Sequence, residues 1–171
     1  MRDPGFADVY NQVELYGRLF GNEKAAARVA GLKDRVASVE RSVQGSSGRT
    51  AAILFVYLGN DPPGAYGADS MSDAQLKTVG LTNVFGDVDK RYFDPSVEEI
   101  IARDPDVLIL LHVEGEPEAV KTTFRANPGV DRMKAVRNDD ILVLRFEFTD
   151  PPTPLSVEGL ERIASAFAGR K

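Results

Sequence analysis

The sequence predicts an α/β fold: a mostly parallel sheet with helices on both faces, wound like a Rossmann lobe. Apolar runs at residues 50–58, 106–113 and 139–148 are typical of strands that are buried on both faces. Helical patterns separate these runs, and strands that alternate with helices form parallel sheets. With 171 residues, the chain is long enough for one domain with a substantial core.

Two helices are expected before the first strand. Residues 6–20 place apolar side chains on one helical face, and Gly17 and Gly21 are expected to interrupt this helix. A longer helix is expected to begin at Asn22 as its N-cap. Its apolar stripe consists of Val29, Leu32, Val36, Val39 and Val43. Packing of this stripe on the sheet is favoured over a coiled coil, because three heptads are the lower limit for the coiled-coil signal.

Shorter helices are expected between and after the strands. Ser72 is the expected cap of a helix over residues 72–80, and Ser96 and Glu99 form an expected capping box for the next helix. The remaining expected elements are a helix at 96–104, a short strand at 82–86, and helices from Glu116 to about Asn127 and at 156–169.

The composition argues against several classes of function. A net charge of −5 without a basic cluster disfavours nucleic acid or an anionic membrane surface as partner. The absence of cysteine excludes disulfides and thiolate metal sites, and a single histidine cannot build a histidine-rich metal site. No apolar run approaches the length of a membrane span, and the polar start MRDPGFADVY lacks the features of a signal peptide. Taken alone, these features indicate a cytoplasmic protein.

The sequence contains no catalytic constellation. Gly59, Gly64 and Gly67 lack the spacing of a dinucleotide-binding motif, and neither a P-loop nor a nucleophile elbow occurs. No cofactor is expected. A binding module is therefore favoured over an enzyme.

Four stretches are informative together: LYGRLFGNEKAAA (15–27), VGLTNVF (79–85), YFDPSVEEIIARDPDVLIL (92–110) and MKAVRNDDILVL (133–144). Their order and spacing resemble the C-terminal lobe of bacterial substrate-binding proteins that deliver ferric siderophores, haem or cobalamin to ABC importers. The third stretch is the most specific of the four. Together they cover nearly the whole chain.

The resemblance implies that residues 1–21 are the end of a helix between two lobes and that residues 22–171 are the C-terminal lobe. The N-terminal lobe, the signal sequence and the lipoprotein cysteine of that family are expected to be missing from this chain. The implied function is capture of an iron–siderophore complex, with haem or cobalamin as alternatives, and delivery to an ABC permease. The implied location is the periplasm or the outer face of the cytoplasmic membrane, with the protein acting as a monomer. The alternative is a cytoplasmic α/β enzyme or nucleotide-binding domain.

Ligand contacts are expected where strands end. The stretch LGNDPPGAYGADS follows the first strand, at the kind of edge where α/β proteins bind ligands. Tyr66 is its expected contact, unless the loop is a solvated turn. Tyr92 stands where the resembling family has a ligand-facing tryptophan, and core burial is the alternative. His112 ends the second strand, where a hydrogen-bonded edge residue is the alternative.

Arg145 and Phe148 close the third strand and complete the expected ligand site. A guanidinium suits the oxygens of an anionic ligand, and the alternative is a surface Arg145 paired with a nearby carboxylate. Glu98 lies in the first turn of the helix capped by Ser96. The resemblance gives Glu98 the role of docking onto an arginine of the permease, whereas its plainer role is to complement the helix dipole.

Overall fold

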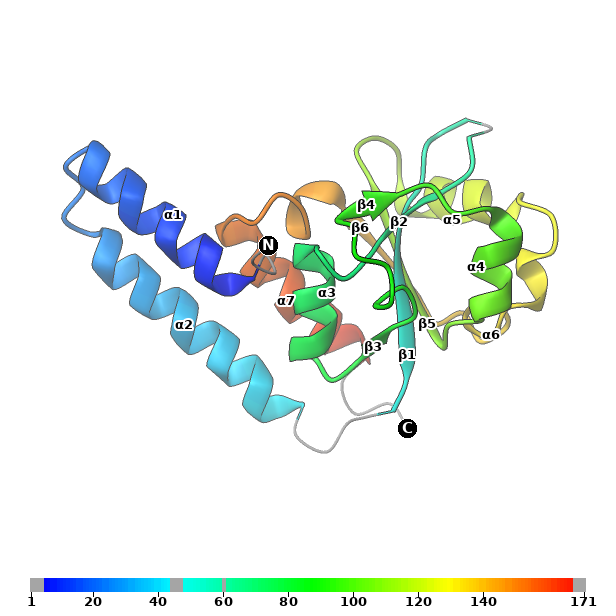
Figure 1. Cartoon of the computed structure of the whole chain (residues 1–171), viewed down its shortest axis with the longest axis horizontal. Helices are drawn as coiled ribbons and strands as arrows, with labels where there is room; N and C mark the ends of the chain where they lie inside the picture. Colours follow the sequence, from blue (N-terminus) through cyan, green and yellow to red (C-terminus); the bar gives the residue numbers. More distant parts are fainter. Residues whose placement is uncertain (1–4, 44–47, 60, 168–171) are drawn as a thin grey trace.

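A mixed sheet with helices on both sides forms the centre of the protein. A computed structural model of the chain describes residues 5–43, 48–59 and 61–167 (Figure 1). The helices are α1 (Phe6–Leu19), α2 (Ala25–Ser42), α3 (Met71–Thr78), α4 (Val97–Arg103), α5 (Pro117–Arg125), α6 (Lys134–Arg137) and α7 (Pro154–Phe167), with short 3₁₀ helices η1 (Val130–Arg132) and η2 (Phe146–Phe148). The strands are β1 (Thr50–Phe55), β2 (Gly64–Tyr66), β3 (Thr82–Asn83), β4 (Tyr92–Phe93), β5 (Val107–His112) and β6 (Ile141–Arg145).

The sheet has the order β4-β2-β1-β5-β6, and β3 pairs with β1 outside this path. Strands β3, β5 and β6 run parallel to their neighbours, whereas β2 and β4 are antiparallel additions at one side. The expected α/β fold with a mostly parallel sheet is therefore confirmed.

Two hydrophobic cores cover the two faces of the sheet. Alternate residues of β5 divide between them, with Ile109 on the side of α2, α3 and α7 and Leu110 on the side of α4, α5 and α6. Figure 1 views the sheet nearly edge-on and shows these two sets of helices on opposite sides. The continuous apolar runs of the sequence follow from this, because a strand covered on both faces has no solvent-facing positions.

Helices α1 and α2 form an antiparallel hairpin that projects from one side of the molecule (Figure 1). Gly17 lies inside α1 and does not interrupt it, which corrects the sequence prediction. A Cβ on Gly17 would lie 2.2 Å from the Cβ of Ala25, so the glycine lets the two helices approach closely. Gly21 makes the turn with a φ of 61°, a conformation that favours glycine.

The apolar stripe of α2 is buried as expected, but it packs mainly against α1 and α7. The hairpin is thus an outer layer on α7, not a helix lying directly on the sheet. Asn22 is not the N-cap, because α2 begins at Ala25 with Lys24 in the cap position. The Asn22 side chain instead accepts a hydrogen bond from the Lys24 backbone N–H (3.1 Å).

Two strands end earlier than the apolar runs predict. Strand β1 stops at Phe55 and not at residue 58, and β6 stops at Arg145, after which the chain turns into η2. The predicted strand at 82–86 is only the two residues of β3. Conversely, the loop after β1 is less irregular than expected, since it contains β2 paired with β1.

Of the three helix caps expected from the sequence, only Ser96 is a cap, since Asn22 and Ser72 are not. Ser96 accepts a hydrogen bond from the Glu99 backbone N–H (3.1 Å), but the expected capping box is only half formed, because the Glu99 carboxylate lies 3.3 Å from Arg103 Nη2 instead. Helix α3 is capped by Ser70, which accepts from the Asp73 N–H (3.1 Å), and not by Ser72. The final helix was expected at 156–169; α7 starts two residues earlier, and residues 168–171 lie outside the described part of the chain.

None of the helices in the described ranges combines the length and apolar character needed to cross a membrane.

The packing of α7 against η2 generates a first prediction. A Cβ on Gly159 would lie 1.9 Å from the backbone oxygen of Phe148, so Gly159→Ala must displace α7. We expect this variant to lower the free energy of unfolding by about 1–3 kcal/mol, measured by urea denaturation. Gly31→Ala is the matched control, since Gly31 is exposed in α2 and a Cβ there meets nothing within 4 Å.

The control is expected to stabilise the protein by up to about 1 kcal/mol, because alanine favours the helix and restricts the unfolded chain. Equal stability of the two variants would contradict the close approach of α7 and η2.

Candidate functional site

The order of the parallel strands reverses beside β1, and this defines a candidate ligand edge. From β1 the chain first forms β3 on one side of β1, and it later forms β5 on the other side. The carboxyl ends of β1 and β5 therefore flank the switch point at which open α/β sheets bind ligands. The loops that leave these two strands touch each other, since a Cβ on Gly115 would lie 2.8 Å from a Leu58 methyl carbon.

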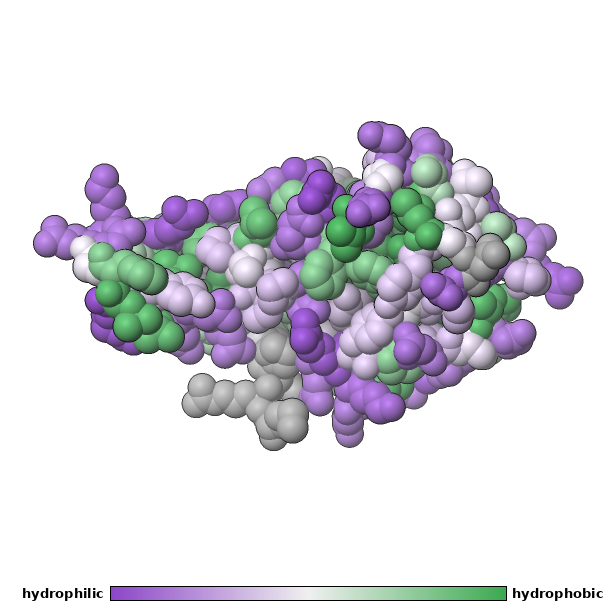
Figure 2. Space-filling view, turned by 90° about the horizontal axis from the view of Figure 1, so that it is seen from above, coloured by the Kyte–Doolittle hydropathy of each residue, from purple (hydrophilic) through white to green (hydrophobic). Residues whose placement is uncertain are grey.

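Four aromatic side chains line this end of the sheet: Phe55, Tyr57, Tyr92 and Phe146, here called the aromatic edge. The Phe55 ring lies 4.7 Å from Tyr57 and 5.7 Å from Phe146 between centroids. The hydroxyl oxygens of Tyr57 and Tyr92 are 2.9 Å apart and share a hydrogen bond. Figure 2 looks down onto this end of the molecule, where hydrophobic and hydrophilic residues are mixed. The ring contacts and the hydroxyl pair connect the four side chains from η2 to β4.

Tyr92 is held in position by β2. Its ring packs edge-on against Tyr66, with 5.3 Å between centroids. A Cβ on Gly64 would lie 1.7 Å from the Tyr92 hydroxyl oxygen, so the glycine provides the space that the phenol occupies. Burial, followed by the hydrogen bond shared with Tyr57, raises the pKa of Tyr92, and the phenol stays protonated. Tyr92 is partly buried, so it is neither a fully exposed nor a fully buried core side chain.

Tyr66 lies inside the lobe, with only 2% of its surface exposed. Strand β2 turns its side chain into the core beneath Tyr92, so within this lobe Tyr66 supports the aromatic edge from below. Burial and the nearby Asp150 carboxylate raise the pKa of Tyr66.

Polar groups lie at the ends of β5 and β6. Arg145 Nε donates to Glu147 Oε1 (2.5 Å), which is the ion pair that the sequence offered as the alternative to a ligand contact. Partial burial opposes ionisation of Glu147, but its own backbone N–H and Arg145 hold the pKa of the carboxyl below its usual value. His112 is buried and donates from Nδ1 to the Glu114 backbone carbonyl (3.0 Å). In the described residues, no group of three or more His, Asp or Glu side chains is arranged to hold a metal ion.

Phe148 faces α7. The Arg162 guanidinium lies 4.4 Å from the centroid of its ring, and Gln75 Nε2 donates to its backbone oxygen (2.8 Å). Phe148 therefore joins η2 to α3 and α7 and is not a member of the aromatic edge.

Glu98 is exposed in the first turn of α4, as the sequence predicted. Figure 1 shows that α4 begins at the same loop-bearing end of the molecule as the aromatic edge. Within the described chain, no hydrogen bond or ion pair involves the Glu98 carboxylate, whereas Glu99 pairs with Arg103.

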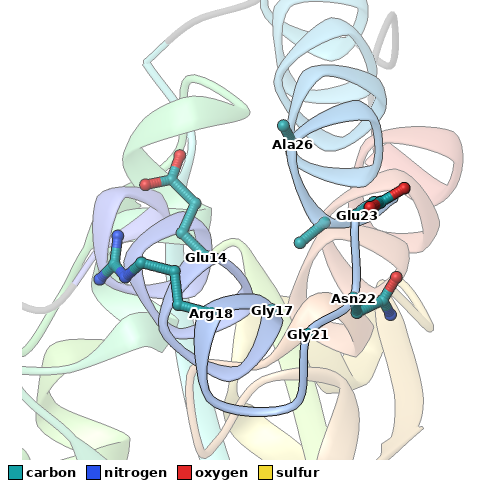
Figure 3. Close-up of a pocket in the computed structure, with 8 residues that line it drawn as sticks. Glu14, Gly17, Arg18, Gly21, Asn22, Glu23 and Ala26 are labelled. Atoms are coloured by element: carbon teal, nitrogen blue, oxygen red, sulfur yellow. The ribbon is translucent and has the colours of Figure 1, made fainter.

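A separate hollow of about 470 Å³ lies where α1 and α2 meet. Figure 3 shows Glu14 and Arg18 on α1 at one side of it and Glu23 and Ala26 at the other. Several apolar side chains are exposed at this end of α1, including Phe20 with 80% of its surface. Hairpin and hollow lie far from the switch point, at the opposite side of Figure 1.

Sequence reasoning missed two members of the aromatic edge, Phe55 and Tyr57, because both belong to an apolar run that is interpreted as one strand. No sequence signal marks them, because the end of β1 at Phe55, which leaves Tyr57 as the first large side chain of the following loop, is hidden within a continuous apolar run. Phe146 is expected at the end of the third predicted strand, 139–148, and lies in η2 directly after β6.

Comparisons with known proteins agree with this arrangement. The family model described as periplasmic binding protein matches residues 1–148. A structure titled as an ABC-type Fe³⁺-hydroxamate transport system from Saccharomonospora viridis has 50% sequence identity and a TM-score of 0.92, covering 98% of this chain and 58% of that chain. No match was found among curated proteins.

More distant structures share the fold. A periplasmic haem-binding protein from Pseudomonas aeruginosa has 20% identity and a TM-score of 0.84, covering 97% of this chain and 61% of that chain. A periplasmic vitamin B12-binding protein from Vibrio cholerae has 14% identity and a TM-score of 0.78, covering 97% of this chain and 62% of that chain. The chain thus spans about three fifths of the length of these three structures. The match over residues 1–148 shows that the chain belongs to the periplasmic binding protein family.

Proposed function

We propose that this chain is the ligand-binding lobe of a solute-binding protein that captures an iron–siderophore complex and delivers it to an ABC permease. The observation that carries the proposal is the 50% identity to the Fe³⁺-hydroxamate transport protein over 98% of this chain. The relatives described as haem-binding and vitamin B12-binding proteins are only 20% and 14% identical, so they support the fold and not the ligand.

The chemistry of the aromatic edge supports the same ligand class. Exposed or half-exposed rings suit the organic part of a chelate, and ligand sites typically combine such surfaces with a few polar groups. Arg145 can turn its guanidinium from Glu147 to anionic oxygens of a ligand, because both side chains are at the surface. In this proposal Tyr92 contacts the ligand directly, Tyr66 supports it, and His112 fixes the loop after β5 through its bond to Glu114.

The proposed partners and location follow from the family. A protein of this kind works outside the cytoplasmic membrane, either in the periplasm or anchored at the outer face, and one copy meets the permease. Glu98 is the proposed docking residue, because it is an exposed carboxylate at the loop-bearing end of the molecule.

The 171-residue chain alone should bind its ligand weakly. Ligand sites bury most of the ligand surface, and a single edge of one sheet covers only one side of a chelate. We expect calorimetric titration with a ferric trihydroxamate to give a dissociation constant well above about 1 μM. This corresponds to a binding free energy less favourable than about −8 kcal/mol. Micromolar or tighter binding would contradict a site that needs a second wall.

Tyr92→Ala should weaken binding more than it destabilises the fold. Loss of a stacked aromatic ring is expected to reduce affinity by about tenfold, measured by NMR titration of the chain with a diamagnetic gallium(III) trihydroxamate. Phe85→Leu is the control, since Phe85 is fully buried in the core and its replacement should lower the melting temperature without changing affinity. The same behaviour of both variants would mean that Tyr92 acts only in packing.

Glu98→Arg should separate docking from ligand binding. The replacement removes at most about 0.3–1 kcal/mol of helix-dipole stabilisation, so affinity and melting temperature should change little. Association with the permease should fall more than tenfold, because a like-charge contact would replace an ion pair.

Glu118→Arg is the matched control for Glu98→Arg, because Glu118 is an exposed carboxylate in the first turn of α5. Both variants would be compared by uptake in cells that depend on a binding protein containing this chain. Normal uptake with Glu98→Arg would exclude the docking role.

A further inference from the structure

We propose that the ligand edge of this chain carries surplus negative charge and selects a chelate with a cationic side group, such as a trihydroxamate with a free terminal amine, over an anionic chelate. The inference rests on the proposed function and narrows its ligand class. A ferric trihydroxamate centre is neutral, because the hydroxamate anions balance the trivalent metal, so the side group sets the charge of the whole ligand. A ferric tricatecholate is strongly anionic and is disfavoured.

Exposed carboxylates follow the strands that end at this edge. Strand β4 runs parallel to β1, because both pair antiparallel with β2, so β4 ends at the same edge as β1 and β5. The stretches directly after these three strands, residues 56–63, 94–96 and 113–117, contain no lysine or arginine. Their acidic side chains, here called the acidic rim, are all exposed: Asp61, Asp94, Glu114 and Glu116. The rim borders the proposed ligand contacts and is not a separate site.

Asp94 is the member of the acidic rim that lies beside a proposed ligand contact. The pairing of β4 with β2 continues to Asp94, which is level with Gly64 at the end of β1. After burial and the Tyr57 hydroxyl, the Asp94 carboxylate also raises the pKa of Tyr92, so its charge acts at the Tyr92 phenol. An ammonium group of a ligand that covers Tyr92 would therefore meet a carboxylate, and such charge-assisted hydrogen bonds are strong.

The arginines at this edge do not offset the acidic rim. Arg91 pairs with the buried Asp150 carboxylate, and Arg145 pairs with Glu147. If Arg145 turns to the oxygens of a chelate, Glu147 stays beside it, so the two charges still balance. Lys90 precedes β4 and lies on the side away from the edge. Within the described chain, no ion pair involves a carboxylate of the acidic rim.

The test compares three gallium(III) trihydroxamates that share one metal centre and differ only in charge. A linear trihydroxamate with a free terminal amine gives a cationic complex, its N-acetylated form a neutral one and its N-succinylated form an anionic one. We expect NMR titration of the 171-residue chain at low salt to show about three- to tenfold tighter binding of the amine form than of the acetylated form, with the succinylated form weakest. These differences should shrink at about 0.5 M salt, because salt screens exposed charges.

Asp94→Asn tests the acidic rim directly. The ratio of affinities for the amine and acetylated forms should fall by about threefold, because the carboxylate nearest to Tyr92 is removed. Asp34→Asn is the matched control, since Asp34 is an exposed carboxylate in α2, and the ratio should stay as in the wild type. Asp94 is also exposed, so both variants should fold, and their melting temperatures would verify this.

Several results would overturn the inference. Equal binding of the amine and acetylated forms at low salt, or tightest binding of the succinylated form, would refute the charge selection and leave the proposed function standing. A preference for the amine form that persists at high salt, or in Asp94→Asn, would refute its origin in the acidic rim. A wild-type chain that binds none of the three complexes even at millimolar concentration would refute the proposed function as well.

Discussion

Strand β1 is paired along both of its edges, and the arrangement of the ligand edge depends on this constraint. One edge pairs with β5 from Ala51 to Phe55, and the other is shared by β3 at the start and β2 at the end. Because β2 occupies the end of that second edge, the chain returns antiparallel to β1 just where a ligand would lie. This return brings Gly64 beside Phe55 and places β4, with Tyr92, next in the sheet. Strand pairing thus brings Phe55 and Tyr92 to the same end of the sheet.

The parts of the fold that the sequence could predict are those with a strong periodic signal. Strands buried on both faces produce continuous apolar runs, and the amphipathic helices between them show a 3.6-residue period, so the α/β class followed directly. Strands of two or three residues, such as β2 and β4, carry no periodicity. Strand ends were also hidden, because Val56 stays buried and Phe146 packs on the core after the ladder has ended. Gly17 shows a third limit, since a glycine used for close helix packing looks the same in sequence as a helix breaker.

The position of the candidate site was predictable, but only part of the side chains that form it were, since Tyr92 was expected there and Phe55 and Tyr57 were not. Strand-to-loop edges bind ligands in α/β sheets, and the stretch after the first strand does lie at the switch point. Which side chains face outwards depends on the residue at which each strand stops. Strand β2, which was not predicted, turns Tyr66 inwards. Strand β1 ends at Phe55, so Tyr57 lies in the following loop. Arg145 differs from these residues, since pairing with a nearby carboxylate was an alternative offered by the sequence, and Glu147 is that partner.

The aromatic edge is supported mainly by the sheet, and this decides what kind of binding surface it is. Phe55 and Tyr92 lie in strands, and Phe146 directly follows β6, so three of the four rings are attached to hydrogen-bonded backbone. Of the four residues, Tyr57 alone lies in a loop, and its hydroxyl shares a hydrogen bond with the hydroxyl of Tyr92. A surface ordered in advance loses little conformational freedom when it binds, so more of the contact energy appears as affinity. Rings that remain partly exposed in one lobe also represent apolar surface that a ligand or a second wall would cover. A preordered and partly exposed surface of this kind suits the proposed role of the aromatic edge as one wall of a ligand site.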